Sequence, residues 1–228
     1  FKDKKFQKNG NLDFNWLSNN WINAQRKINS NTDKNIIFKT HSVRGKINGN
    51  FFTDESVCLG FIYVIRDPRD IIISLSHHSG SPIDKTINDL LYDKRKISSA
   101  RKANELVSTW RNNLNSWLNF NKVSNLIIKY EDMLTDPKEK ILEIITFLQT
   151  IMNVNFNLSD NNLKKILNET SFKNLQKLEK LNGFREATKY TNFFREGKSN
   201  QWKTILSKEQ IKKIENELII PMQTIGYI

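Results

Sequence analysis

The stretch GFIYVIRDPRDIIIS, residues 60–74, carries the clearest structural signal in the sequence. Its first six positions are rich in β-branched and aromatic residues, which predicts a buried strand over residues 60–65. Pro68 favours the first position of a helix, because it has no N–H group to leave unpaired there. The apolar pattern that follows predicts a helix over residues 68–78. A buried strand that runs directly into a helix is typical of α/β folds.

Arg66 stands at the junction of this strand and this helix. The N-terminus of a helix attracts anions, and an arginine guanidinium binds phosphate through two parallel hydrogen bonds. Ser74 lies about two turns into the predicted helix and can add a hydroxyl group. The junction therefore predicts a phosphate site without a glycine-rich loop. The alternative interpretation is a salt bridge between Arg66 and Asp70 that only caps the helix.

Two further apolar runs, residues 36–40 and 126–130, also predict buried strands, and helical patterns separate the three. Helices are also predicted over residues 15–28, 83–97, 100–120, 138–150, 161–167, 172–178 and 208–219. The alternation predicts an α/β fold with a central parallel β-sheet flanked by helices. No linker-like stretch divides the sequence, so we expect residues 1–228 to form a single domain.

The composition excludes some classes of protein and leaves others open. Hydrophobic residues make up 38% of the chain, which is enough for a packed core and too much for a disordered chain. The net charge of +12 attracts anions, but lysines on a solvated surface would give the same charge. Cys58 is the only cysteine, which excludes an intrachain disulfide and a cysteine-based zinc site.

The sequence contains no sign of membrane insertion or export. No apolar run approaches the ~18–20 residues that span a bilayer, and no signal peptide opens the chain. We therefore expect a cytoplasmic protein, with the qualification that an N-terminal targeting segment is not visible in a chain that begins at Phe1.

Two other groups of residues have chemical potential. Lys39 and His41 lie at the end of the first predicted strand, and ligands of open parallel sheets bind beyond the carboxyl ends of the strands. Histidine accepts protons near neutral pH, and lysine stabilises developing negative charge. Residues 195–197 join a basic residue to a glycine, where backbone N–H groups can bind an anion. The alternatives are a non-catalytic histidine and an ordinary polar loop.

In this order, the segments resemble the sulfotransferases that depend on 3'-phosphoadenosine 5'-phosphosulfate (PAPS), especially the bacterial members related to the cytosolic enzymes. The resemblance extends from about Ile36 to Tyr227. It is carried by FKTH (38–41), IYVIRDPRD (62–70) with Ser74, IIKYEDM (127–133), TSF (170–172), and FREG (194–197) with Trp202 and Lys203.

The resemblance implies a role for each matching residue. It implies that His41 is the general base that deprotonates the acceptor, and that Lys39 lies beside the bridging oxygen of the phosphosulfate. The implied donor-binding residues are Arg66 and Ser74 at the 3'-phosphate, Tyr130, Thr170 and Phe172 around the adenine, and Arg195 and Gly197 in a terminal loop over the 3'-phosphate. The implied product is adenosine 3',5'-bisphosphate (PAP), and no metal is implied.

The sequence departs from the family pattern at two places. The terminal loop of the family reads Arg-Lys-Gly, whereas Glu196 here puts a negative charge beside the phosphate site and weakens it, unless the side chain points to solvent. The family's 5'-phosphosulfate loop, of the type Pro-Lys-Ser-Gly-Thr-Thr-Trp, and its opening strand have no counterpart, since Gly10 is the only glycine before Lys39. We therefore expect an N-terminally truncated sulfotransferase fold of the P-loop NTPase type.

The function that these features imply is transfer of a sulfuryl group from PAPS to a hydroxyl or amine acceptor. The main alternative is a non-catalytic or truncated sulfotransferase-like domain that binds PAP weakly or not at all. A P-loop kinase is disfavoured because the pattern G-x-x-x-x-G-K-[ST] does not occur. A nucleic-acid-binding module is disfavoured because helix-turn-helix, zinc-finger and RRM patterns do not occur, so we expect no nucleic acid partner.

The identity of the acceptor does not follow from the sequence. We expect a small molecule or a glycan, bound by the variable loops at residues 42–56, 77–96 and 181–191. Residues 212–217 either carry a homodimer contact or form a solvated helix face.

Overall fold

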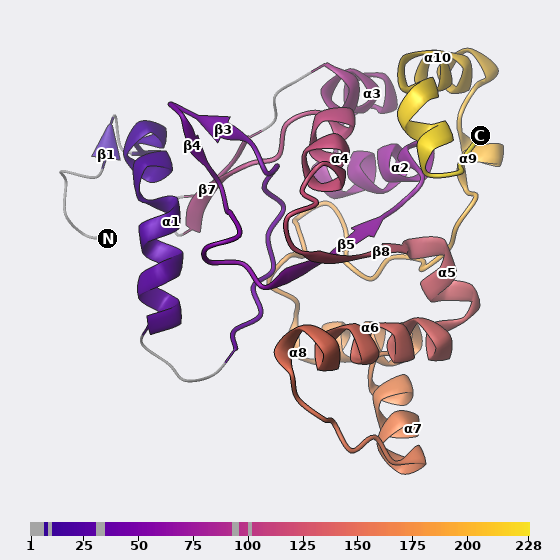
Figure 1. Ribbon diagram of the computed structural model, residues 1–228. Helices are drawn as coiled ribbons and strands as arrows, with labels where there is room; N and C mark the ends of the chain where they lie inside the picture. The colour runs from indigo at the N-terminus through magenta and orange to yellow at the C-terminus, as the bar shows by residue number, and fades with distance from the viewer. Residues whose placement is uncertain (1–6, 9–10, 31–34, 93–95, 100–101) are drawn as a thin grey trace. The chain divides into compact units, whose positions relative to one another are not determined.

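A computed structural model describes residues 7–8, 11–30, 35–92, 96–99 and 102–228 (Figure 1). The chain forms two compact units, each made of two segments of sequence. The first unit comprises Phe1–Phe61 and Asp89–Asn125, and the second comprises Ile62–Asn88 and Leu126–Ile228. The prediction of a single domain stays a prediction.

The first unit combines two helices with short antiparallel hairpins. Its elements are β1 (Gln7–Lys8), β2 (Asn11–Leu12), α1 (Phe14–Ser30), β3 (Lys46–Ile47), β4 (Asn50–Phe51), β6 (Lys96–Ser99), β7 (Lys102–Leu106) and α4 (Trp110–Leu118). The pairs are β1 with β2, β3 with β4, and β6 with β7.

Aromatic contacts form much of the core of this unit. The ring of Phe61 lies 4.9 Å from that of Trp117 and is stacked on Phe120 at 5.8 Å between centroids. Trp117 and Phe120 are buried. The indole Nε1 of Trp117 donates a hydrogen bond to the carbonyl oxygen of Ser42 at 3.0 Å, so α4 fixes the backbone that follows His41.

The second unit contains most of the described helices and the two neighbouring strands β5 and β8. Its elements are β5 (Gly60–Ile65), α2 (Pro68–Ser79), α3 (Ile83–Leu91), β8 (Ser124–Lys129), α5 (Tyr130–Thr135), α6 (Pro137–Met152), α7 (Asp160–Glu169), α8 (Phe172–Asn182), α9 (Trp202–Ile205) and α10 (Lys208–Thr224); β5, β8 and α3 extend a few residues past its boundaries. β5 and β8 are neighbours in one sheet and run in the same direction, with α2 following β5 and α5 following β8 (Figure 1). The predicted α/β class, with parallel strands and flanking helices, is confirmed.

Local chemistry explains why α2 begins where it does. Pro68 occupies its first turn, and the Asp67 side chain caps the helix by accepting a hydrogen bond from the N–H of Arg69. The buried Arg69 guanidinium also binds Glu215 of α10 and the carbonyl oxygen of Tyr227. These contacts join the start of α2 to the C-terminal part of the chain.

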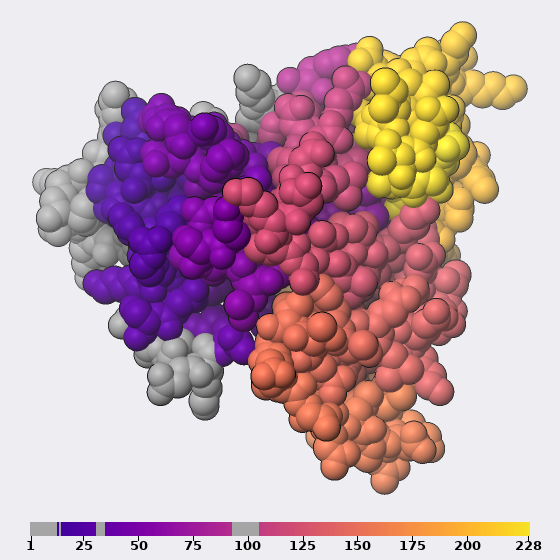
Figure 2. All heavy atoms as spheres, in the orientation of Figure 1, coloured from indigo at the N-terminus to yellow at the C-terminus, as the bar shows by residue number. Residues whose placement is uncertain are grey.

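Helix α10 closes the second unit and lies at its surface among the yellow spheres of Figure 2. It buries Ile214, Leu218 and Met222 and begins with a capping box between Ser207 and Gln210. Residues 212–217, for which a dimer contact was one interpretation, lie within this helix.

Seven of the eleven predicted strands and helices are observed close to their predicted positions. They are the strands at residues 60–65 and 126–130, and the helices at residues 15–28, 68–78, 138–150, 161–167 and 208–219. The helix predicted over residues 172–178 is also observed but is longer, because α8 continues to Asn182.

The prediction of a strand over residues 36–40 is wrong. Residues 35–45 are not in a strand, and Ile37 is 71% exposed. A strand needs a neighbour for its backbone hydrogen bonds, and the side chains of Asn113 and Trp117 instead bind the carbonyl oxygens of His41 and Ser42. A β-branched, apolar sequence alone did not determine pairing here.

Two predicted helices are also wrong in part. The helix predicted over residues 83–97 ends at Leu91, and residues 96–99 form β6 instead; residues 93–95 lie outside the described residues. Within the helix predicted over residues 100–120, residues 102–106 form β7 and α4 begins only at Trp110; residues 100–101 lie outside the described residues. Thr109 sets that boundary, because its side chain accepts a hydrogen bond from the N–H of Asn112 as an N-cap.

Among the described residues, no helix combines the length and the apolar character required to cross a bilayer.

Candidate functional site

Arg66 directly follows β5, and its guanidinium lies in a largely buried position, with 18% of the side chain exposed. One terminal nitrogen donates a hydrogen bond to the carbonyl oxygen of Lys198 at 3.0 Å. The guanidinium carbon lies 4.5 Å from the centre of the Tyr130 ring. The buried Nε has no hydrogen-bond acceptor among the described residues. A buried donor without a partner is costly, and an anionic ligand would satisfy it.

Asp70 tests the alternative that Arg66 only forms a capping salt bridge. Its carboxylate is 1% exposed and accepts hydrogen bonds from the N–H groups of Asn200 at 2.7 Å and Trp202 at 3.0 Å. The nearest Arg66 nitrogen is 3.8 Å away, beyond hydrogen-bond length. Burial raises the pKa of Asp70. Asp70 therefore mainly holds the terminal loop and leaves hydrogen-bonding capacity on Arg66.

Ser74 lies one turn after Asp70 on α2, so both side chains are on the same face of the helix. It is half-buried. This places a hydroxyl on the side of α2 that also carries the contacts to Asn200 and Trp202.

The terminal loop, residues 193–201, contains Arg195 and Gly197. The Arg195 guanidinium forms an ion pair with the Glu196 carboxylate and also binds Gln201 Oε1 at 3.1 Å. Glu196 therefore does not simply point to solvent, the condition under which we expected it to be harmless. It competes with any phosphate for Arg195.

Gly197 lies against the ring of Phe172 at the start of α8. Its φ is +61°, a conformation that favours glycine. A Cβ atom at this position would meet Phe172 Cδ2 at 2.5 Å. The Phe172 ring also makes an edge contact with Phe194, with 6.2 Å between centroids. The glycine is thus required by both backbone conformation and close packing.

Thr170 and Tyr130 complete the predicted donor residues. Thr170 ends α7, is exposed, and donates its hydroxyl to the carbonyl oxygen of Ile166 at 2.7 Å. Tyr130 begins α5 beside Arg66, and burial raises the pKa of its hydroxyl. Every predicted donor residue lies in the second unit. The structure brings Arg66 against Tyr130, and Phe172 against the terminal loop.

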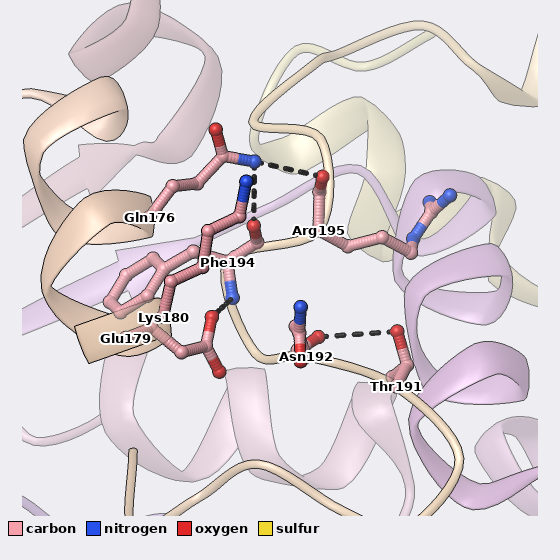
Figure 3. A pocket seen from close by; sticks show the side chains of 7 residues that line it. All are labelled: Gln176, Glu179, Lys180, Thr191, Asn192, Phe194 and Arg195. Atoms are coloured by element: carbon pink, nitrogen blue, oxygen red, sulfur yellow. Dashed lines mark hydrogen bonds between the residues drawn. The ribbon is translucent and has the colours of Figure 1, made fainter. Parts of the chain in front are cut away.

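A cavity of about 250 Å³ lies between α8 and the terminal loop (Figure 3). Its lining residues are Gln176, Glu179, Lys180, Thr191, Asn192, Phe194 and Arg195. Glu179 is buried, and its two carboxylate oxygens accept hydrogen bonds from the N–H groups of Phe193 and Phe194 at 2.7 and 2.9 Å. The sequence prediction assigned no role to this residue.

Lys39 and His41 lie in the first unit. Lys39 is exposed, and the His41 side chain is 47% exposed. His41 Nδ1 lies 2.9 Å from Glu105 Oε2. In the tautomer with the proton on Nδ1, this N–H group donates a hydrogen bond to Glu105. Nε2 then has a lone pair and can accept a proton. A histidine oriented by a carboxylate is a common arrangement of general bases.

Glu105 was missed by the sequence prediction, which assigned it to the interior of a helix. Its pairing with a residue 64 positions earlier depends on β7, and the local sequence gives no signal for that pairing. Gln176 and Glu179 were missed for the same reason, because their partners are backbone groups 14 to 19 positions further along the chain.

Within the described residues, no group of three or more His, Cys, Asp and Glu side chains is arranged to hold a metal ion.

Comparison with known proteins gives consistent matches. The family model described as Sulfotransferase domain matches residues 3–218. Cytosolic sulfotransferase 8 of Arabidopsis thaliana is 28% identical over 165 residues, covering 71% of this chain and 49% of that protein. Sulfotransferase 2A6 of Mus musculus is 24% identical over 218 residues, covering 90% and 72%. The chain spans about half the length of several of the curated relatives that it matches.

Solved structures with a similar fold have low sequence identity. Retinol dehydratase in complex with androsterone and the inactive cofactor PAP gives a TM-score of 0.52 at 19% identity, covering 71% of this chain and 46% of that one. Mouse sulfotransferase SULT7A1 complexed with PAP gives a TM-score of 0.51 at 20% identity, covering 71% and 58%. These similarities establish the fold.

Proposed function

Because the chain belongs to the sulfotransferase family, we propose that it binds PAPS and transfers the sulfuryl group to a hydroxyl or amine acceptor. The observation that carries this proposal is the Arg66 guanidinium, which lies largely buried beside Tyr130 and has an Nε without an acceptor among the described residues. A 3'-phosphate would supply that acceptor.

The residues of the second unit fit the donor nucleotide in this proposal. Arg66 and Ser74 bind the 3'-phosphate, and the N–H group of Gly197 closes over it with Arg195. The adenine is bound by Tyr130, Thr170 and Phe172. Two features support the fit. Arg66 Nε has no acceptor among the residues that the structure describes, and the space beside Gly197 is one that a Cβ atom would fill by contacting Phe172. The donor supplies the sulfuryl group, and the protein supplies position and charge.

The residues of the first unit act on the acceptor in this proposal. His41 Nε2 takes the proton from the acceptor hydroxyl or amine as the acceptor oxygen or nitrogen attacks sulfur. Glu105 orients the imidazole through Nδ1 and stabilises the imidazolium that forms. Lys39 stabilises negative charge on the oxygen that leaves with PAP.

We propose a small molecule or a glycan as the acceptor. Two relatives have names that refer to small molecules or amines, luciferin sulfotransferase of Photinus pyralis and amine sulfotransferase of Oryctolagus cuniculus. A cytoplasmic location and a homodimer through α10 remain predictions, as does the absence of a nucleic acid partner.

A second candidate function is nucleotide binding without transfer. The ion pair between Arg195 and Glu196 favours it, because that pair must rearrange before Arg195 can bind phosphate.

A transfer assay separates the two candidates. The chain is incubated with PAPS and a panel of phenols, alcohols and amines, and release of PAP is measured. Acceptor-dependent release supports the enzyme, whereas PAP binding without any acceptor-dependent release supports the second candidate.

Replacing Glu196 by glutamine is expected to tighten PAP binding by about threefold to tenfold, since it removes a negative charge near the phosphate and frees Arg195. Binding of 5'-AMP, which has no 3'-phosphate, should not change. Both affinities are measured by calorimetric titration. Glu143→Gln is the control, because Glu143 also pairs with a nearby cation, Lys140, and its loss changes the net charge equally. Equal tightening in both variants would exclude a local role of Glu196.

Replacing Gly197 by alanine is expected to weaken PAP binding about tenfold, because strained backbone and displaced neighbours cost of order 1–3 kcal/mol. The new Cβ would meet the Phe172 ring at 2.5 Å. Gly183→Ala is a matched control, since Gly183 also has a positive φ, of +70°, but has no atom within 4 Å of such a Cβ. If both variants bind PAP equally well, the contact with Phe172 has no part in donor binding.

A further inference from the structure

The geometry points to one face of α8 as the element that positions the terminal donor loop. We infer that Gln176 and Glu179 are positioning residues, which hold the backbone of residues 193–195 so that Arg195 and Gly197 meet the 3'-phosphate. This inference rests on the proposed function, and it assigns a role to two residues outside the proposed donor-binding and catalytic sets.

Three side chains on α8 contact the terminal loop. The Phe172 ring packs on Gly197 and Phe194. Gln176 Nε2 donates hydrogen bonds to the carbonyl oxygens of Phe194 and Arg195, at 2.8 and 3.1 Å. Residues at spacings of four and seven lie on one face of a helix, so Phe172, Gln176 and Glu179 form a single row that faces the loop.

Glu179 provides the strongest of these contacts. It is 7% exposed, and each carboxylate oxygen accepts one backbone N–H group, from Phe193 and from Phe194. Hydrogen bonds to an ionised acceptor are stronger than neutral ones. Figure 3 shows Gln176 and Glu179 reaching the loop backbone from the same side, next to the cavity. Beside the cavity, where α8 and the terminal loop do not pack closely, hydrogen bonds from Gln176 and Glu179 therefore connect the two.

The other end of the loop is held by α2. Asp70 accepts the N–H groups of Asn200 and Trp202. Arg195 and Gly197 therefore lie between two anchors, α8 before them and α2 after them. Each anchoring helix also carries proposed donor residues, Phe172 on α8 and Ser74 on α2. Loss of the hydrogen bonds from Gln176 and Glu179 would leave Arg66, Ser74 and the adenine residues in place but release Arg195 and Gly197.

Two isosteric variants test this inference by calorimetric titration of the full chain with PAP and 5'-AMP. Glu179→Gln places an amide NH₂ against a backbone N–H group, and Gln176→Glu places a carboxylate against two carbonyl oxygens. We expect each variant to weaken PAP binding by about tenfold or more, with 5'-AMP binding changed by less than about twofold, because 5'-AMP does not use the terminal loop. Lys177→Gln, an exposed position on the same helix, is the control and should bind both nucleotides as the parent chain does.

Equal weakening of PAP and 5'-AMP in both variants would show only a general structural role, and unchanged PAP binding would show no role; either result overturns the inference. Hydrogen exchange of the nucleotide-free chain supplies an independent readout. We expect faster exchange at the amides of Phe193 and Phe194 in Glu179→Gln and not in Lys177→Gln. If the parent chain fails to prefer PAP over 5'-AMP, the proposed function fails, and unchanged exchange would then also overturn the anchoring by α8.

Discussion

Replacing His41 by alanine is expected to lower the rate of sulfuryl transfer by about 10²–10⁴-fold, the usual contribution of a general base. The reason is that no other group would take the acceptor proton when the acceptor attacks. PAP binding should stay nearly intact, because the proposed donor residues do not include His41. Acceptor-dependent release of PAP measures the first effect, and calorimetric titration measures the second.

The control for this prediction is Arg111→Ala. Arg111 is an exposed residue of α4 in the first unit and has no role in the proposed chemistry. It should keep the parental rate. The transfer rate of Glu105→Gln should lie between that of His41→Ala and that of the control. This variant keeps a hydrogen bond to His41 Nδ1 but removes the charge that stabilises the imidazolium. Full turnover in His41→Ala would mean that another residue is the base.

Replacing Arg66 by alanine is expected to weaken PAP binding by roughly 2–3 kcal/mol, or about 30- to 150-fold, the scale of a charge-assisted contact with phosphate. Binding of 5'-AMP should change little. The physical reason is that the guanidinium lies largely buried beside Tyr130, with an Nε that lacks an acceptor in the part of the chain that the structure describes. Calorimetric titration with the two nucleotides measures the difference directly.

Arg66→Lys refines this prediction. It keeps the positive charge but loses the planar arrangement of donors, so we expect it to recover only part of the affinity. Melting temperatures are needed for both variants, because Arg66 also lies 3.8 Å from the buried Asp70. An Arg66→Ala protein that is folded and binds PAP normally would place the 3'-phosphate site elsewhere.

The segment from β5 to α2 could be predicted from sequence because its signals are local. The run before Arg66 has the composition of a buried strand, and Pro68 with the Asp67 cap starts the helix at one defined place. The candidate site follows from this segment, since the arginine, the helix N-terminus and Ser74 are close together in the chain itself. Short-range chemistry was sufficient there.

Other parts of the molecule depend on contacts between distant residues. Residues 36–40 have the composition of a strand, but they lie exposed, with the backbone that follows them bound by side chains of α4. The carboxylates of Glu105 and Glu179 have partners that only the folded chain brings near. Glu196 could be recognised from the sequence as a departure from the family pattern, but only the structure shows that its carboxylate pairs with Arg195. The hydrophobic periodicity of a segment predicts its secondary structure but not which distant residues contact it.

We expect the second unit to have a site for a 3'-phosphorylated adenine nucleotide built around Arg66. Calorimetric titration of this chain with PAP, using 5'-AMP as the control, measures binding at that site. We expect micromolar binding of PAP that depends on the 3'-phosphate, with 5'-AMP binding much more weakly. Equal affinity for the two nucleotides, or no binding of PAP by the folded chain, would contradict it.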